Sequence, residues 1–313
     1  MMKVLRQSRA LQIWSSLWTV YIIWGSTYIA IAYVIETMPP LLAMGIRFLT
    51  AGILLTLLIV SRSGVSEMLV PAPQIRTSVV MGAVVLGFGL GNVAVAEVHV
   101  PSGVVALIIA ALPLWISIFK TLTGQSPSKR AWLGVIIGFI GVAVLLKPGS
   151  IQAVSNESSA TVVFFMFMVL IGNIGWALGT YLAPRFPLPK NSLVFTAYEM
   201  LAGGITLTIG GFIKGESVGD FFQASPSSWF WFWYLVFFGS MLAYSAYLWL
   251  VANAPVALTA TYAYVNPVIA VSLGAIFRDE RITRNYAIGG LIVIVGVITV
   301  VISERRSDTF KDM

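Results

Sequence analysis

The amino-acid sequence predicts an all-α integral membrane protein with ten transmembrane helices. Of its 313 residues, 58% are hydrophobic and only 10% are charged, against about 45–50% and 25% in soluble domains. So few charged side chains cannot cover the surface of a water-soluble domain of this size, which excludes a soluble globular protein. Long apolar runs, separated by short polar segments, recur along the whole chain, as in polytopic helical proteins.

About 20 helical residues are needed to cross a hydrocarbon layer about 30 Å thick. Such runs occupy residues 13–33, 41–60, 77–98, 102–122, 131–146, 162–182, 193–213, 229–251, 256–277 and 286–302. A β-barrel would need strands that alternate apolar and polar residues, whereas residues 134–146 are apolar throughout. The first run is longer than the 7–15 apolar residues of a signal peptide. We therefore expect it to remain as the first helix.

Lysine and arginine residues predict the orientation, because they accumulate in cytoplasmic connections. Of the 19 basic residues, Arg47 lies deep inside a predicted span. The others, with Lys120 counted at the end of its span, divide thirteen to five between the two sets of alternate connections. The richer set includes both ends of the chain. The tails 1–12 and 303–313 are therefore predicted to be cytoplasmic, and residues 278–284 to lie outside.

Internal similarity predicts two five-helix repeats, residues 13–146 and 162–302, joined by a linker at 147–161. Because five is odd, the second repeat enters the membrane from the opposite side, so the repeats are inverted, an architecture typical of alternating access. The matching features are Pro101 and Pro113 with Pro255 and Pro267, Gly134 and Gly141 with Gly289 and Gly296, and Trp24–Tyr28 with Trp176–Tyr181.

The chain lacks the residue types on which several kinds of site depend. The chain has no cysteine and a single histidine, His99, so we expect no metal site, no cofactor and no enzymatic activity. Its basic residues form no dense tract, which argues against nucleic acid as a partner. It has no phosphate-binding loop for ATP hydrolysis. The expected partners are the lipid bilayer and a small-molecule substrate.

Arg47 and Glu199 are charged residues inside predicted spans, at nearly equivalent positions of the two repeats. Such charges are costly in lipid and commonly mark transport pathways. Arg47 is a candidate for binding a carboxylate or phosphate. Glu199 is a candidate for carrying a coupling proton or for pairing with a substrate ammonium. The alternative is that both side chains extend to the lipid headgroups and have structural roles.

Residues 256–277 contain a second candidate site around Pro267. A proline inside a helix removes a hydrogen bond and frees the carbonyl of Ala263, and Tyr262 and Asn266 lie one turn apart beside it. We expect this opening to face a substrate cavity; the alternative is a kink that only serves packing. Pro113 is expected to kink its own helix in the same way.

Aromatic residues and glycines add two further expectations. Trp24, Tyr28 and Trp176 lie deep in predicted spans and recur between the repeats, so they are candidates for the cavity wall, with core packing as the alternative. Pairs of glycines four residues apart allow helices to approach closely and are expected to serve packing. These pairs are Gly87 and Gly91, Gly134 and Gly138, and Gly175 and Gly179.

Taken together, these motifs resemble those of the drug/metabolite transporter superfamily, specifically the ten-helix EamA-type exporters. The resemblance is carried by Trp24–Tyr28, Arg47–Leu49, Val100–Gly103, Pro113, Trp176–Gly179, Tyr262–Val268, and Glu280 followed by Gly289 and Gly296. It implies two inverted EamA repeats around a central cavity. From the positions discussed above, we expect this cavity to be lined by Trp24, Tyr28, Arg47, Trp176, Tyr262 and Asn266. The acidic residue present as Glu280 has no counterpart in the first repeat, which reads Gly124-Gln125-Ser126.

The resulting functional hypothesis is a secondary transporter in the cell (inner) membrane. It is expected to export a small organic metabolite, such as an amino acid, by alternating access and with possible proton coupling. One alternative is a passive channel for small solutes. A less favoured one is an integral membrane enzyme that acts on lipids.

The predicted orientation can be tested at Thr283. Because the natural chain has no cysteine, a single cysteine at this position should react with an impermeant thiol reagent in intact cells, since residues 278–284 are expected outside. Modification only after the cells are permeabilised would contradict the orientation.

Overall fold

A computed structural model describes residues 2–125, 127–147, 158–254, 256–259 and 261–309. These residues form helices joined by short connections, with no β-strand among them. The expected linker lies mostly outside the described residues. Within them, the expected tails are helical, because the first helix begins at Met2 and the last runs to Thr309.

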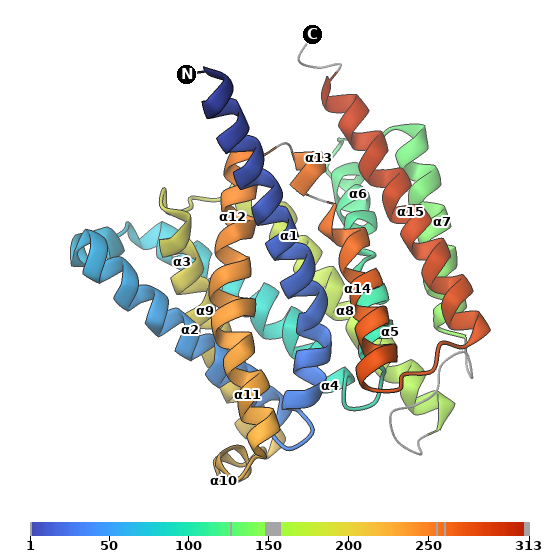
Figure 1. Ribbon diagram of the computed structural model, residues 1–313, viewed down its shortest axis with the longest axis horizontal. Helices are drawn as coiled ribbons and strands as arrows, with labels where there is room; N and C mark the ends of the chain where they lie inside the picture. Colours follow the sequence, from blue (N-terminus) through green and yellow to red (C-terminus); the bar gives the residue numbers. More distant parts are fainter. Residues whose placement is uncertain (1, 126, 148–157, 255, 260, 310–313) are drawn as a thin grey trace.

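The ten predicted spans correspond to helical segments along the chain (Figure 1). The first repeat comprises α1 (Met2–Val34), α2 (Pro40–Ser63), α3 (Ala72–Met81) with η2 (Gly82–Leu90) and α4 (Gly91–Ala96), α5 (Ser102–Ile109) with α6 (Leu112–Leu122), and α7 (Lys129–Leu145). The second comprises α8 (Ser159–Leu182), α9 (Ser192–Lys214), α11 (Pro226–Tyr234) with η4 (Leu235–Leu242) and α12 (Ala243–Asn253), α13 (Val256–Thr259) with α14 (Tyr262–Phe277), and α15 (Arg284–Thr309). Short elements in connections are η1 (Val65–Met68), η3 (Ala183–Arg185) and α10 (Val218–Phe222).

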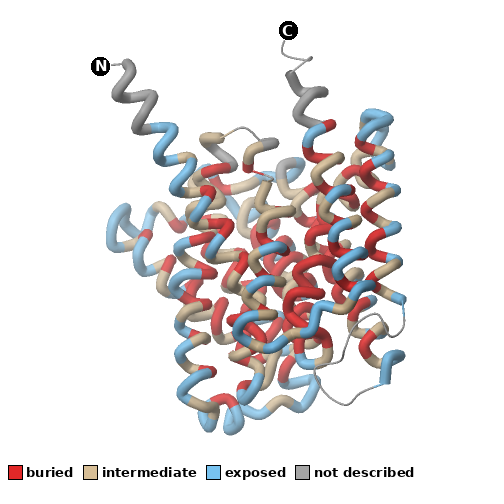
Figure 2. The backbone as a smooth tube through the Cα atoms, turned by 45° about the vertical axis from the view of Figure 1, so that its right-hand side comes forward, coloured by how far each residue is buried: buried red, intermediate tan, exposed pale blue. Residues whose placement is uncertain are grey.

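Eight of these segments are long and apolar enough to cross a membrane. The other two are α7, with 17 residues, and the pair α13 and α14, in which a 16-residue apolar helix follows a single turn. Buried residues concentrate where helices face one another, and exposed residues follow the outer faces (Figure 2). The predicted fold class, an all-α integral membrane protein, is confirmed.

Equivalent helices of the two repeats pack against each other. The pairs α2 with α9 and α7 with α15 make the most extensive contacts in the described structure, while α1 packs on α14 and α8 packs on α5 and α6. The two termini lie at the same end of the molecule (Figure 1). An even number of crossings accounts for that placement.

Two of the spans contain π-helical segments at corresponding positions, η2 in the first repeat and η4 in the second. A π-helix is rare and often occurs at functional sites. Both segments lie in the middle of their spans, between α3 and α4 and between α11 and α12. These segments were not expected from the sequence.

The fourth span is broken rather than kinked. Its helix stops at Ile109 and restarts at Leu112, so that Pro113 lies in the first turn of α6. Proline suits that position because its missing N–H needs no partner there. Pro267, in contrast, lies inside the continuous helix α14.

Glycines bring the backbones of α7 and α15 into contact. A Cβ atom added at Gly296 would lie 2.4 Å from the backbone nitrogen of Gly138, and one added at Gly141 would lie 2.5 Å from that of Val293. The pair α2 and α9 has the same construction, because a Cβ at Gly204 would lie 2.8 Å from the nitrogen of Leu49. Small residues at such crossings are what holds helices together in lipid.

The Gly296→Ala substitution should therefore destabilise the protein. A methyl group has no space between two backbones, so the helices must separate, at a cost of about 1–3 kcal/mol. Thermal unfolding in detergent should show a lower midpoint than for the natural protein. Gly210→Ala is the matched control, since its nearest neighbour would be the Leu41 Cδ1 atom at 3.7 Å. Equal midpoints for the two variants would contradict this account of the crossing.

Candidate functional site

A cavity with about 90 Å³ of space open to water lies between the two repeats. Both repeats contribute to its wall. The lining residues from the first repeat include Trp24, Thr27, Tyr28, Ile31, Arg47, Phe48, Leu86, Leu90, Val93, Ala106, Ile109, Ala110 and Leu112. Those from the second are Trp176, Gly239, Ser240, Tyr244, Tyr262, Ala263, Asn266 and Pro267.

All six residues expected to bind substrate, Trp24, Tyr28, Arg47, Trp176, Tyr262 and Asn266, line this cavity. They come from four different spans, so only the packing of the repeats brings them together. Their role in binding stays a prediction. The arrangement shows that the six side chains share one space.

The Arg47 guanidinium is buried in the cavity wall, with 4% of the residue exposed. Its Nε donates a hydrogen bond to the Ser240 hydroxyl at 3.0 Å, and its Nη1 lies 3.4 Å from the Met44 sulfur. No described carboxylate lies within ion-pair distance of it. Because the side chain is buried, it does not extend to the lipid headgroups. A buried cation without a carboxylate is poised to bind an anion.

Glu199 is buried as well, but it has a different partner from Arg47. Its carboxylate accepts a hydrogen bond of 2.7 Å from the Tyr244 hydroxyl. Tyr244 lines the cavity, whereas Glu199 is not among the residues of the cavity wall. Proton coupling through Glu199 stays a prediction.

Four aromatic rings form a cluster on one side of the cavity. The Trp24 ring centroid lies 6.0 Å from that of Tyr244, 5.0 Å from that of Tyr247 and 5.4 Å from that of Tyr262. The Trp24 indole N–H also donates to the Gly239 carbonyl at 3.3 Å. Tyr244 and Tyr247 are not among the site residues expected from the sequence. Their spacing of three residues within one predicted span was the available signal.

The two broken or kinked spans form walls of different polarity. From α14, the cavity receives Tyr262 and Asn266, and the buried Asn266 Oδ1 has no hydrogen-bond partner among the described residues. From α5 and α6 it receives only apolar residues. The carbonyls of Ile108 and Ile109 are not free, because the Asn173 side-chain amide of α8 donates to them at 2.9 and 3.3 Å. Of these two spans, the one in the second repeat thus supplies the more polar part of the wall.

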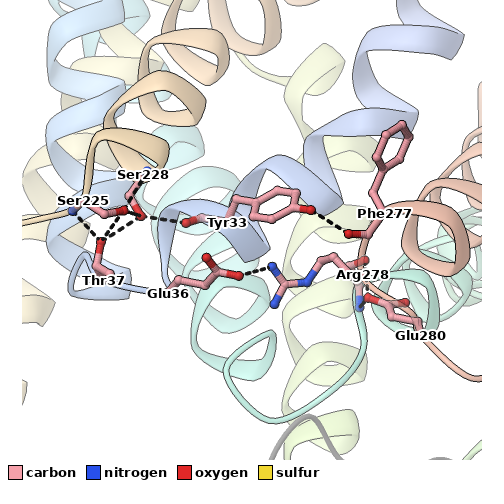
Figure 3. A network of polar contacts seen from close by, with 9 residues as sticks. Tyr33, Glu36, Thr37, Ser225, Ser228, Phe277, Arg278 and Glu280 are labelled. Atoms are coloured by element: carbon pink, nitrogen blue, oxygen red, sulfur yellow. Dashed lines mark hydrogen bonds and ion pairs between the residues drawn. The ribbon is translucent and has the colours of Figure 1, made fainter.

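A polar network closes the end of the molecule opposite the termini (Figure 3). The Tyr33 hydroxyl donates to the Phe277 carbonyl at 2.8 Å, and Arg278 forms an ion pair with Glu36. The Ser228 hydroxyl donates to the Tyr33 carbonyl at 2.8 Å. We call these five residues the outer network, after the side of the membrane on which the sequence predicts residues 278–284 to lie. It joins the end of α1 to the beginning of α11 and the end of α14. These contacts between distant segments were not expected from the sequence.

Glu280 has a structural role beside this network. Its carboxylate accepts hydrogen bonds from the backbone N–H groups of Ser102 and Gly103 at 2.8 and 3.1 Å, and from the Ser102 hydroxyl at 2.7 Å. A carboxylate stabilises a helix N-terminus in this way. The corresponding residue of the first repeat, Ser126, lies outside the described residues.

Comparisons with known proteins identify the family. The model of the EamA-like transporter family matches residues 14–147 and 163–302. The uncharacterized inner membrane transporter YedA of Escherichia coli (strain K12) is 36% identical over 298 residues, which cover 94% of this chain and 93% of YedA. Protein PecM of Dickeya dadantii is 26% identical, with 89% and 88% of the two chains covered.

A chain of known crystal structure has the same fold, with a TM-score of 0.63 over 96% of this chain and 99% of its own. At 18% identity this likeness concerns the fold alone. The match to two EamA segments agrees with the resemblance drawn from the sequence motifs. The chain therefore belongs to the EamA-like transporter family, and it is a membrane transporter.

Proposed function

We propose that this transporter is a secondary exporter of small organic metabolites that carry a carboxylate, amino acids in particular. The observation that carries the proposal is the buried Arg47 in the cavity wall, which has no carboxylate partner among the described residues. Burial of an unpaired cation is costly. A substrate carboxylate that binds the guanidinium would offset that cost.

The cavity also offers groups for a substrate ammonium. The Asn266 Oδ1 atom is an unpartnered acceptor, and the faces of Trp24 and Tyr262 can bind a cation. Tyr28 and Trp176 would complete the apolar wall around the substrate side chain. A small cavity with one group that binds a carboxylate and others that bind an ammonium group fits a zwitterionic substrate.

Alternating access is supported by the two repeats and by the outer network. The cavity lies between helices of both repeats, so a movement of one repeat against the other would open it first to one side and then to the other. The outer network joins elements of both repeats at one end. Release of these contacts would open that end.

Three further features belong to the proposal. The excess of Lys and Arg in the connections on the side of the termini favours cytoplasmic termini. The similarity to YedA supports the inner membrane as the location. Export is the direction that the resemblance to EamA-type exporters implies.

Arg47→Gln should reduce transport of amino acids. The substitution removes a charge-assisted hydrogen bond worth about 1.5–3 kcal/mol, equivalent to about a 10- to 150-fold change in affinity. The measurement is counterflow in liposomes, in which the purified protein exchanges a ¹⁴C-labelled mixture of L-amino acids outside for the same unlabelled mixture inside. The apparent affinity should fall in the variant.

Arg62→Gln is the control, because Arg62 is an exposed residue at the end of the same helix. It should leave counterflow at the natural level. Natural counterflow in Arg47→Gln would refute the role of Arg47. Flux that does not saturate and shows no counterflow would instead support a passive channel.

A further inference from the structure

Glu97 is a buried acidic residue at the end of α4. Only 3% of it is exposed, and neither carboxylate oxygen has a hydrogen-bond partner among the described residues. An ionised carboxylate in such surroundings is costly. The arrangement therefore suits the protonated carboxyl.

Glu97 lies at the end of the cavity that faces the outer network. Val93, one turn earlier on the same face of α4, lines the cavity. Tyr28, another residue of the cavity wall, is close enough for the charge of Glu97 to act on it. The carboxyl thus lies between the proposed substrate site and the end that Glu36 and Arg278 close.

The charges around Glu97 come from the connection between α14 and α15. Glu280 and Arg278 act on it electrostatically, with opposite signs. The elements packed against α4 are η2, α8 and α2. Segment η2 has no titratable residue, and α8 has none between residues 159 and 180. Helix α2 contributes Arg47 within the membrane. His99, two residues away, stacks on the Phe165 ring at 3.7 Å.

An ionised Glu97 would disturb the outer network. Its charge would repel Glu280, which is held at the N-terminus of α5, and would attract Arg278 away from Glu36. Protonation removes both effects. Loss of the proton would therefore favour opening of this end, and gain of the proton would favour its closure.

We propose that Glu97 is the proton-binding site that couples the transporter to a proton gradient, a proposal that rests on the proposed function. A proton from water on the side of the outer network adds to one carboxylate oxygen when that end is open. After the repeats rearrange, it returns to water on the opposite side. One proton moves inward while one substrate molecule moves outward.

Glu199 provides a matched comparison. It is as buried as Glu97, at 3% exposed, but its carboxylate accepts a hydrogen bond from Tyr244. Glu97 has no such bond to stabilise its ionised form. The substitutions Glu97→Gln and Glu199→Gln remove the same group from the two sites and leave side-chain size nearly unchanged.

The experiment measures accumulation of the ¹⁴C-labelled L-amino acid mixture in liposomes that have a pH gradient of one unit, acidic inside. A tenfold difference in proton concentration supports at most about tenfold accumulation for one proton per substrate. The natural protein and Glu199→Gln should accumulate label in response to the gradient. Glu97→Gln should show no accumulation above equilibrium, although counterflow persists.

Each opposite result overturns the proposal. Accumulation driven by the pH gradient in Glu97→Gln would overturn it. So would a natural protein that shows counterflow but no accumulation driven by the gradient. Loss of accumulation in Glu199→Gln but not in Glu97→Gln would show that Glu199, and not Glu97, binds the coupling proton. If Glu97→Gln does not fold, Glu97→Asp takes its place and should keep accumulation with a shifted pH profile; an unshifted profile overturns the proposal.

An infrared measurement separates this proposal from the proposed function. Protonated Glu97 in the purified protein should give a carboxyl C=O band that is missing from Glu97→Gln, or shifted in Glu97→Asp, and that disappears at high pH. Absence of counterflow in the natural protein would refute the proposed amino acid transport. Absence of the carboxyl band difference would refute the proton site, whatever the transport result.

Discussion

The close crossings of equivalent helices are the contacts on which the rest of the structure depends. In lipid, no hydrophobic force drives helices together, so van der Waals contact between closely packed backbones has to do so. Glycines in α2, α7, α9 and α15 permit that contact. These helix pairs join the two repeats, and the cavity exists because the repeats are joined at these crossings and separated between them.

Polar groups inside this frame follow one rule, since no water is available to satisfy them in lipid. Where a helix breaks near Pro113, Asn173 from another helix binds the exposed carbonyls. Glu199 is bound by Tyr244. Two charged groups stand out among the described residues: Arg47 has a hydrogen bond to Ser240 but no carboxylate partner, and neither carboxylate oxygen of Glu97 has any hydrogen-bond partner. The proposed substrate and proton would supply what these two residues lack.

The sequence was sufficient to predict the spans and the repeats. The lengths of the apolar runs and the spacing of the matching prolines and glycines can be read directly from a single sequence. They require no knowledge of contacts between distant residues. The family resemblance came from the same motifs and is confirmed by the match to the EamA-like family. The six expected cavity residues were identified because charges, deep aromatic residues and prolines are unusual inside membrane spans.

The partners of these residues could not be predicted, because they depend on contacts between distant helices. Arg47 and Glu199 hold equivalent positions in the repeats, yet each bonds to a residue of the eighth span. The π-helical segments have no marker in the composition of their spans. Glu97 stands at the end of a predicted span, where an acidic residue is not unusual. Only the folded chain shows that its carboxyl is enclosed without a partner.

The central claim is that substrate binds in the cavity between the repeats, and its most direct test is protection of a single cysteine placed there. Ala263 lines the cavity and the natural chain has no cysteine, so Ala263→Cys introduces one reactive thiol. A mixture of L-amino acids should slow its alkylation, and the additional Arg47→Gln substitution should abolish this protection. Alkylation at the same rate with and without the amino acids would contradict the account.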